Sequence, residues 1–213
     1  MVYHVFNKSI AGFVIFNNES EFNRMLKLFQ YYKYEKSYYS FSKFTELQKS
    51  KIENRKIELP LLKEGGKSVA IISYCVMPTH FHLILKEIKE NCVPTFMSKM
   101  LNSYARYFNI RHNRKGHLWE GTYKKVLITS DEQLLHLTRY IHLNPVTAYL
   151  VNKPEEWPYS SYKEYLKIGI KPSEIICDHT DLFNITPSAY KEFVESRISY
   201  QRELAKIKEL LLE

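Results

Sequence analysis

Two histidines separated by a single residue are the first side chains in this sequence that could do chemistry. His80 and His82 lie in "MPTHFHLIL", a segment whose apolar character is typical of a buried strand. Side chains alternate along a strand, so residues i and i+2 point to the same face, about 6–7 Å apart. Two imidazoles on one face, with Phe81 behind them, form a platform for a cation or a phosphate. A pair of surface histidines on a solvated sheet face is the alternative, and the spacing alone does not decide between them.

A second polar pair is expected on a helix that begins near Ser130. Ser130 followed by Gln133 is a capping-box pattern, and Tyr140 and Asn144 are four residues apart, so they share one helical face. If that face lies across the histidine strand, two imidazoles and one amide oxygen form a site for Mg²⁺ or Mn²⁺, with Mn²⁺ favoured by the imidazoles. A phosphate could fill an open position, and Tyr140 would then attack phosphorus to form a phosphotyrosine.

Each of these residues also has an ordinary explanation. Tyr140 is one of 17 tyrosines and could be a core residue. Pro145 is expected to disturb the far end of the helix, and Asn144, which precedes it, could simply cap that end. His136 lies one turn before Tyr140 and competes for the role of third ligand. His4, on the first predicted strand, is more typical of a sheet-surface histidine than of a site residue.

The predicted elements alternate in a recognisable order. Strands are expected over residues 2–10, 68–77, 81–88 and 117–128, and helices over 17–35, 93–116 and from 130 onward. The order of strand, helix, strand, strand, helix, strand predicts an α+β fold with a ferredoxin-like (split βαβ) antiparallel sheet. Helices should cover one face of this sheet. A trailing catalytic helix and appended C-terminal helices should follow it.

The chain divides into two predicted parts. Residues 1–150 are expected to form the catalytic domain, interrupted at about 36–67 by a polar, Lys-rich insertion with weak structure of its own. Residues 151–213 are expected to form a helical C-terminal extension, because the pattern there changes to short amphipathic segments and one long terminal segment.

The charge balance favours a polyanionic partner. The chain carries 31 Lys and Arg against 23 Asp and Glu, a formal net charge of +8, which suits nucleic acid. Three scattered cysteines indicate a reducing compartment rather than a disulfide framework. No segment has the length of a membrane span or the layout of a secretion signal, so we expect a cytoplasmic protein.

Basic side chains near the end of the second predicted helix are the candidates for DNA contacts. They lie beside Tyr104 and Tyr107, whose rings could stack on bases, although a solvated helix end is the alternative. The predicted DNA-binding residues are Arg106, Arg111, Arg114, Lys115 and, on the following strand, Lys124.

Four motifs in the same order resemble one protein family. "MPTHFHLIL", "SYARYFNIRHNRKGHLWEGTYK", "LLHLTRYIHLNPVTAYLV" and "EEWPYSSYKEYL" are similar to the REP-associated tyrosine transposases, which are single-tyrosine HUH transposases of the insertion-sequence type. The resemblance covers roughly residues 2–9 and 68–166. It implies cleavage and rejoining of single-stranded DNA guided by hairpins, a divalent metal on His80, His82 and Asn144, and Tyr140 as the nucleophile.

The resemblance leaves some alternatives open. Thr122 stands where such proteins usually carry Arg, which removes one expected phosphate contact. A domesticated module of the same fold that binds DNA hairpins without turnover is the main rival. A metal-dependent hydrolase of a small phosphate ester is a third possibility. The resemblance does not decide between a monomer and a homodimer, or between a tyrosine acting in cis and one acting in trans.

Overall fold

The computed structural model describes residues 1–35, 39–49, 66–178 and 184–210. The elements, in chain order, are β1 (Val2–Lys8), η1 (Ile10–Gly12), α1 (Glu19–Tyr32), α2 (Phe41–Lys49), β2 (Val69–Val76), β3 (His80–Glu87), α4 (Cys92–Arg111), β4 (Lys124–Ile128), α5 (Asp131–Thr147), η2 (Pro154–Glu156), α6 (Tyr162–Leu166), η3 (Pro172–Glu174), α7 (Pro187–Glu195) and α8 (Ile198–Leu210). No helix among these residues is long and apolar enough to cross a membrane.

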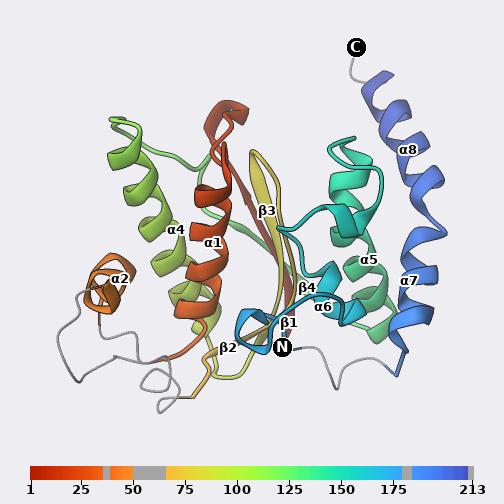
Figure 1. Cartoon of the computed structure of the whole chain (residues 1–213), viewed down its shortest axis with the longest axis horizontal. Helices are drawn as coiled ribbons and strands as arrows, with labels where there is room; N and C mark the ends of the chain where they lie inside the picture. The colour runs from red at the N-terminus through yellow and green to blue at the C-terminus, as the bar shows by residue number, and fades with distance from the viewer. Residues whose placement is uncertain (36–38, 50–65, 179–183, 211–213) are drawn as a thin grey trace.

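The four strands form one antiparallel sheet in the order β2-β3-β1-β4. This order, with α1 and α4 as the two crossover helices, is the ferredoxin-like arrangement that the sequence predicted (Figure 1). The register places His82 opposite Phe6 of β1 and Cys75 of β2, and Phe6 opposite Lys124 of β4. Since residues opposite each other point to the same face, this row of four side chains crosses the whole sheet on one side.

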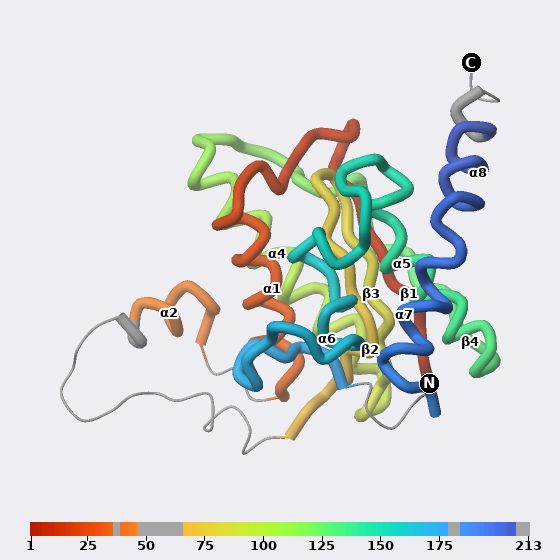
Figure 2. The backbone as a smooth tube through the Cα atoms, turned by 45° about the vertical axis from the view of Figure 1, so that its right-hand side comes forward, coloured from red at the N-terminus to blue at the C-terminus, as the bar shows by residue number. Residues whose placement is uncertain are grey.

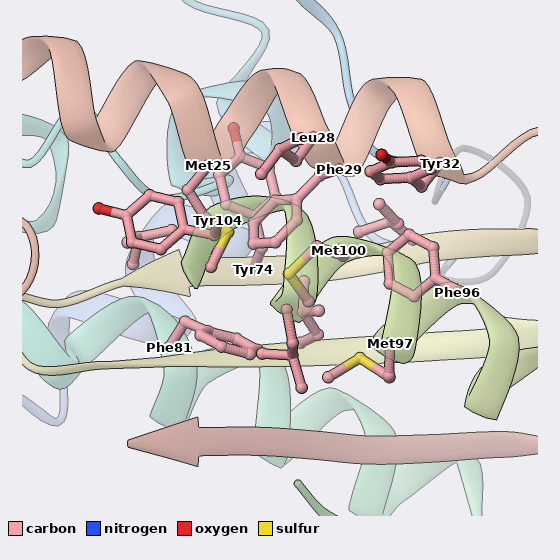
Figure 3. Close-up of a cluster of buried hydrophobic side chains, with 14 of the residues drawn as sticks. Met25, Leu28, Phe29, Tyr32, Tyr74, Phe81, Phe96, Met97, Met100 and Tyr104 are labelled. Carbon is pink, nitrogen blue, oxygen red and sulfur yellow. The ribbon is translucent and has the colours of Figure 1, made fainter. Parts of the chain in front are cut away.

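One face of the sheet is covered by α1 and α4, which pack against each other and against the central strands (Figure 1). Figure 3 shows side chains of both helices meeting Tyr74 and Phe81 of the sheet in a buried cluster. The strand-facing residues of these helices recur at the three- and four-residue spacing of an amphipathic helix. The hydrophobic ones with no exposed surface are Met25, Leu28, Phe29, Val93, Met97, Met100 and Tyr104.

The other face carries α5, which lies on the opposite side of the sheet from α1 and α4 (Figure 1). Its first turn is capped as predicted, because the Ser130 hydroxyl accepts a hydrogen bond from the Gln133 amide at 3.1 Å. Leu134 and Ile141 are buried against β2 and β3 in a second apolar cluster. The expectation that Pro145 disturbs the end of this helix is wrong, because Pro145 lies inside α5, which continues to Thr147.

Two further expectations need correction. The predicted strand at 117–128 is shorter, because β4 begins only at Lys124 and its first four residues are exposed. The predicted insertion at about 36–67 falls mostly outside the described residues. Its residues 41–49 form α2, against the expectation of weak structure, because Phe41 and Phe44 pack on Tyr31 at ring-centroid distances of 5.2 and 4.7 Å.

The described part of the chain after residue 150 contains the helices η2, α6, η3, α7 and α8, of which η2, α7 and α8 contact α5. Tyr162 and Leu166 of α6 and Tyr190 of α7 form a third apolar cluster with Leu143 of α5. Figure 2 shows α8 continuing upward beside α5, and the Arg202 guanidinium of α8 donates to the backbone oxygen of Val146 at 3.2 Å. The division of the chain at residue 150 into two domains stays a prediction.

Candidate active site

His82 is paired with a histidine from the neighbouring strand. It lies on β3 opposite Phe6, and His4 lies two residues earlier on β1. The Nδ1 atom of His82 is 3.0 Å from the Nε2 atom of His4, and the two rings stack with centroids 5.2 Å apart. This hydrogen bond occupies Nδ1 of His82. The remaining ring nitrogen, Nε2, is the one available to a ligand, as is typical of metal-binding histidines whose other nitrogen contacts a protein group.

His80 lies beside His82 on the same face of β3. The two ring centroids are 5.3 Å apart with the planes nearly perpendicular. The Nδ1 atom of His80 is 3.0 Å from the hydroxyl of Thr79, so this histidine also has Nδ1 engaged and Nε2 left over. Two imidazoles with matching nitrogens available therefore stand side by side.

Burial keeps the three histidines neutral at physiological pH. It lowers the pKa of His82 to about 3 and that of His4 to about 4. The pKa of His80 is lowered by burial and by the nearby charge of Lys8. A neutral imidazole keeps its lone pair, which is the form that binds a metal ion. The physical state of the cluster thus suits a cation.

Tyr140 reaches this cluster from the other side. Its ring meets that of His82 edge to face, with centroids 5.8 Å apart, and the side chain is still 40% exposed. Burial of the remainder raises the pKa of Tyr140 above its ordinary value, so the hydroxyl is protonated at neutral pH. A phenol in this state needs nearby positive charge before it can act as a nucleophile.

Asn144 lies one helical turn after Tyr140 on α5. Its Nδ2 atom is buried and has no hydrogen-bond partner in the described part of the chain. Turning the amide by 180° exchanges nitrogen for oxygen at the same place. A buried, unpartnered amide is unusual, and a cation beside its oxygen would satisfy it.

His136, the competing third ligand, is engaged elsewhere. Its Nδ1 atom is 2.7 Å from a guanidinium nitrogen of Arg139, and its ring meets Phe193 of α7 edge to face at 5.6 Å. Across the residues that the structure describes, no three His, Cys, Asp or Glu side chains gather as a metal centre would require. A metal here would therefore depend on a mixed donor set, and His80, His82 and Asn144 stay the predicted ligands.

A cleft of about 480 Å³ opens beside His80. Lys8 and Lys124 contribute positive charge to it, although Lys8 is paired with Glu120 at 2.9 Å. The Lys124 ammonium stands 6.0 Å from the centre of the Phe6 ring. The lining residues are Phe6, Asn7, Lys8, His80, Glu120, Gly121, Thr122 and Lys124.

The predicted DNA-binding residues do not gather in one place. Lys124 lies in the cleft with His80, whereas Arg106 lines a hollow between α4 and α2, on the packed side of the sheet. Arg111 is 3.6 Å from the buried carboxylate of Glu21. Arg114 donates to Asn109 and to the backbone oxygen of His117 at 3.1 and 2.7 Å, which braces the loop after α4. Lys115 is exposed in that loop.

Sequence reasoning missed part of the site. Phe6 was not singled out, although its period-2 relation to His4 on a strand is the signal that could have found it. Thr79 carried no signal, because its role depends on the turn before β3.

Comparisons with known proteins show which family this chain is similar to. Residues 44–144, which include all four candidate site residues, match the family model of IS200-like transposases. A protein of Haemophilus influenzae named "Putative REP-associated tyrosine transposase" is 28% identical over 114 residues. The match covers 48% of this chain and 64% of that protein, so it spans less than two thirds of the relative's length.

A solved structure of the REP-associated tyrosine transposase bound to a REP hairpin shares the fold. The two structures superpose with a TM-score of 0.51 at 16% sequence identity, over 86% of this chain and 88% of that one. The predicted resemblance is therefore confirmed: this chain is similar in sequence and fold to the REP-associated tyrosine transposases, and its central residues carry the pattern of the IS200-like transposase family.

Proposed function

We propose that this chain is a metal-dependent endonuclease and strand transferase for single-stranded DNA that works through a covalent 5′-phosphotyrosine on Tyr140. The observation that carries the proposal is the contact between the partly exposed Tyr140 ring and the buried His82, at a centroid distance of 5.8 Å. A nucleophile from one element thus lies beside two neutral imidazoles from another, and one of them, His80, lines the cleft. The similarity to transposases supports the same reaction class.

The reaction balances without an external energy source. The Tyr140 oxygen attacks phosphorus and forms the new P–O bond while the bond to the 3′ oxygen of the preceding sugar breaks. The tyrosine loses its proton and the departing oxygen gains one, so a free 3′ hydroxyl and a 5′-phosphotyrosine result. A 3′ hydroxyl can attack that linkage in the reverse sense, which rejoins a strand and restores Tyr140.

His80, His82 and Asn144 are the residues that would hold a divalent ion, Mg²⁺ or Mn²⁺. When bound, such an ion would polarise the phosphoryl group and neutralise the charge that builds up in the transition state. Tyr140 depends on this help because burial raises its pKa. His4 and Thr79 hold the two imidazoles in place through their Nδ1 atoms.

The cleft beside His80 is the part of the surface best suited to the DNA strand. It presents Lys124 and the Phe6 ring, a cation and an aromatic face, which are the groups that bind phosphate and stack on bases. The net charge of +8 adds a general attraction to polyanions. The similar structure bound to a REP hairpin supports a DNA hairpin as the guide for this chain too.

One observation favours the second candidate function, a hairpin-binding module with weak turnover. Thr122, which stands where the resemblance implies Arg, lines the same cleft as His80. A hydroxyl there offers one hydrogen bond and no charge, whereas a guanidinium offers two bonds and a positive charge. The covalent adduct distinguishes the two candidates.

The test mixes the protein with end-labelled single-stranded hairpin DNA and Mn²⁺, followed by a denaturing gel. The wild type should yield a labelled protein band that disappears in excess chelator. Tyr140→Phe should bind the same DNA and form no such band. Tyr149→Phe, which alters an exposed tyrosine just beyond α5, is the matched control and should behave like the wild type. Hairpin binding by the wild type without any adduct would favour the binding module.

A further inference from the structure

His142 is a fully buried histidine on α5, the helix that carries Tyr140. Its Nδ1 atom is 2.7 Å from the hydroxyl of Tyr190 on α7. Its Nε2 atom is 2.7 Å from the hydroxyl of Ser161 and 3.2 Å from that of Ser73 on β2. A buried polar group of this kind joins α5 to the sheet, to the segment before α6, and to α7.

The donor and acceptor of each hydrogen bond around His142 can be assigned from its partners. Thr138 donates its proton to the backbone oxygen of Leu135 at 2.7 Å, and Tyr190 donates to Thr138 at 2.9 Å. The Tyr190 oxygen therefore accepts from Nδ1–H of His142. This leaves Nε2 of His142 as the acceptor for a serine hydroxyl. Every member is satisfied, which is the condition under which a buried polar network fixes one arrangement.

An irregularity in strand β2 brings Ser73 toward His142. The pairing of β2 with β3 has a register irregularity between Ile71 and Ser73. As a result two consecutive side chains, Ile72 and Ser73, both reach α5: Ile72 through the apolar cluster with Ile141, and Ser73 through His142. A bulge re-aims a side chain in this way and is common next to active sites.

Rotation of α5 about its axis moves the side chains of Tyr140 and His142 together. Successive residues on a helix are about 100° apart, so Tyr140 and His142 project from opposite flanks of Ile141, which is buried on the sheet. One flank bonds to Ser73 and Ser161, and the other places Tyr140 against His82. A roll of about 10° would move atoms at the ~6 Å radius of the helix surface by roughly 1 Å.

We propose that His142 is a positioning residue that fixes the rotation of α5 about its axis and thereby the aim of Tyr140 at the scissile phosphate. The inference rests on the proposed function and deepens it. Apolar contacts of Ile141 and Leu134 set how closely α5 approaches the sheet, whereas directional hydrogen bonds set its roll. A misplacement of about 1 Å at a reacting group costs on the order of 100-fold in rate.

The test compares His142→Phe with Leu143→Ala. Phe fills the same space, and Ser73 and Ser161 still bond to each other at 3.1 Å, so the variant should fold. Leu143→Ala opens a cavity against α6 and α7 on the same helix and removes none of the side chains that bond to His142. Adduct formation is measured at saturating hairpin DNA with Mn²⁺. In parallel, 3-fluorotyrosine at position 140 reports the ring environment by ¹⁹F NMR without DNA or metal.

His142→Phe should lower the adduct rate by on the order of 10–100-fold, leave the hairpin Kd within about twofold because the phosphate contacts lie elsewhere, and shift the ¹⁹F signal. Leu143→Ala should lower the melting temperature with a wild-type rate and signal. Should His142→Phe fail to fold, Ser73→Ala removes one bond of the network and should shift the same signal.

A wild-type rate and an unmoved ¹⁹F signal in the folded His142 or Ser73 variant would overturn the inference, as would an equal loss of rate in Leu143→Ala. Absence of any adduct in the wild type would instead contradict the proposed function, and the ¹⁹F comparison would still decide whether His142 sets the orientation of Tyr140.

Discussion

The two faces of one sheet differ in what covers them. Along β3, Phe81 and Leu83 point to the α1–α4 face and are fully buried, whereas His80 and His82 point to the α5 face. The first face is covered by the two helices α1 and α4 (Figure 1). On the second face, α5 buries Ile141 against the sheet but leaves Tyr140 40% exposed.

Alternate residues of β3 therefore have different roles: those on one face stabilise the fold, and those on the other form the candidate site. The packed face supplies the large apolar burial that a small domain needs to fold. The other face is only partly covered, so it can combine low dielectric, which keeps the histidines neutral, with access for a strand of DNA. The period of two along β3 lets both requirements be met by alternate residues.

The largest effects should come from neighbouring residues on opposite faces. His82→Ala should reduce metal-dependent cleavage by on the order of 10³-fold, since metal stabilisation of the transition state is worth several kcal/mol, with hairpin affinity unchanged within a few fold. Phe81→Ala should instead lower the free energy of unfolding by about 3–5 kcal/mol, because it leaves a cavity in a closed core.

Denaturant titration and a gel assay of cleavage, run on both variants at low temperature, separate the two effects. Cleavage by folded Phe81→Ala at near the wild-type rate is expected. Undiminished cleavage by His82→Ala would remove the metal role from this face.

The next effect concerns the partner of His82. His4→Ala should weaken Mn²⁺ binding by about 10–100-fold, because loss of a group that orients a metal ligand typically costs that much. Isothermal titration calorimetry without DNA measures this directly. His117→Ala, an exposed histidine after α4, is the control and should bind Mn²⁺ normally. Equal affinities for both variants would mean that the His4–His82 hydrogen bond does not tune the site.

On the packed side, the contribution of the buried Glu21 carboxylate to the free energy of unfolding should depend on pH. Glu21 is fully buried, and although burial raises its pKa, hydrogen bonds from Asn17 and His112 hold the pKa below the ordinary value of 4.5. Its charge therefore stabilises the fold above that value, and this stabilisation disappears as the pH falls through the lowered pKa.

Glu21→Gln should lower the free energy of unfolding by about 1.5–3 kcal/mol at pH 7, and the gap to the wild type should narrow below about pH 4. Thermal melts from pH 7 to pH 3 give the comparison. Glu19→Gln, on the same helix turn and exposed, should show no such trend. A gap for Glu21→Gln that stays constant with pH would show that its charge is not what matters.

The smallest effect tests which face meets the DNA. Lys124→Gln, in the cleft, should reduce the salt slope of hairpin binding by about one and weaken binding severalfold at moderate salt. Arg106→Gln makes the same change of charge on the packed side and should leave both quantities unchanged. If Arg106→Gln had the larger effect, the DNA path would run over α4 and the proposed division between the faces would be wrong.

The sequence predicted the periodic parts of the molecule well. The order of elements, the cap at Ser130 and the placement of His80 and His82 on one strand follow from local patterns of period 2 and 3.6. The sequence left open whether the trailing helix lies across the histidine strand, and the contact of Tyr140 with His82 places it there.

The remaining features depend on contacts between distant residues. His4 meets His82 across 78 positions of the chain, and that pairing is set by strand register, which single-sequence patterns do not fix. The density of basic residues near the end of α4 did not reveal that Arg111 lies beside Glu21 or that Arg114 braces a loop. His142 gave no signal because its partners come from three separate segments.

The most direct test of the central claim is to locate the covalent bond. Wild-type protein trapped on a single-stranded hairpin with Mn²⁺ is digested with protease, and the nucleotide-bearing peptide is sequenced by mass spectrometry. The account predicts a 5′ phosphate on Tyr140 in the peptide containing "YIHLNP", together with a released strand that ends in a free 3′ hydroxyl. Attachment at Tyr104, Tyr107 or Tyr123, or cleavage by water with no adduct, would contradict it.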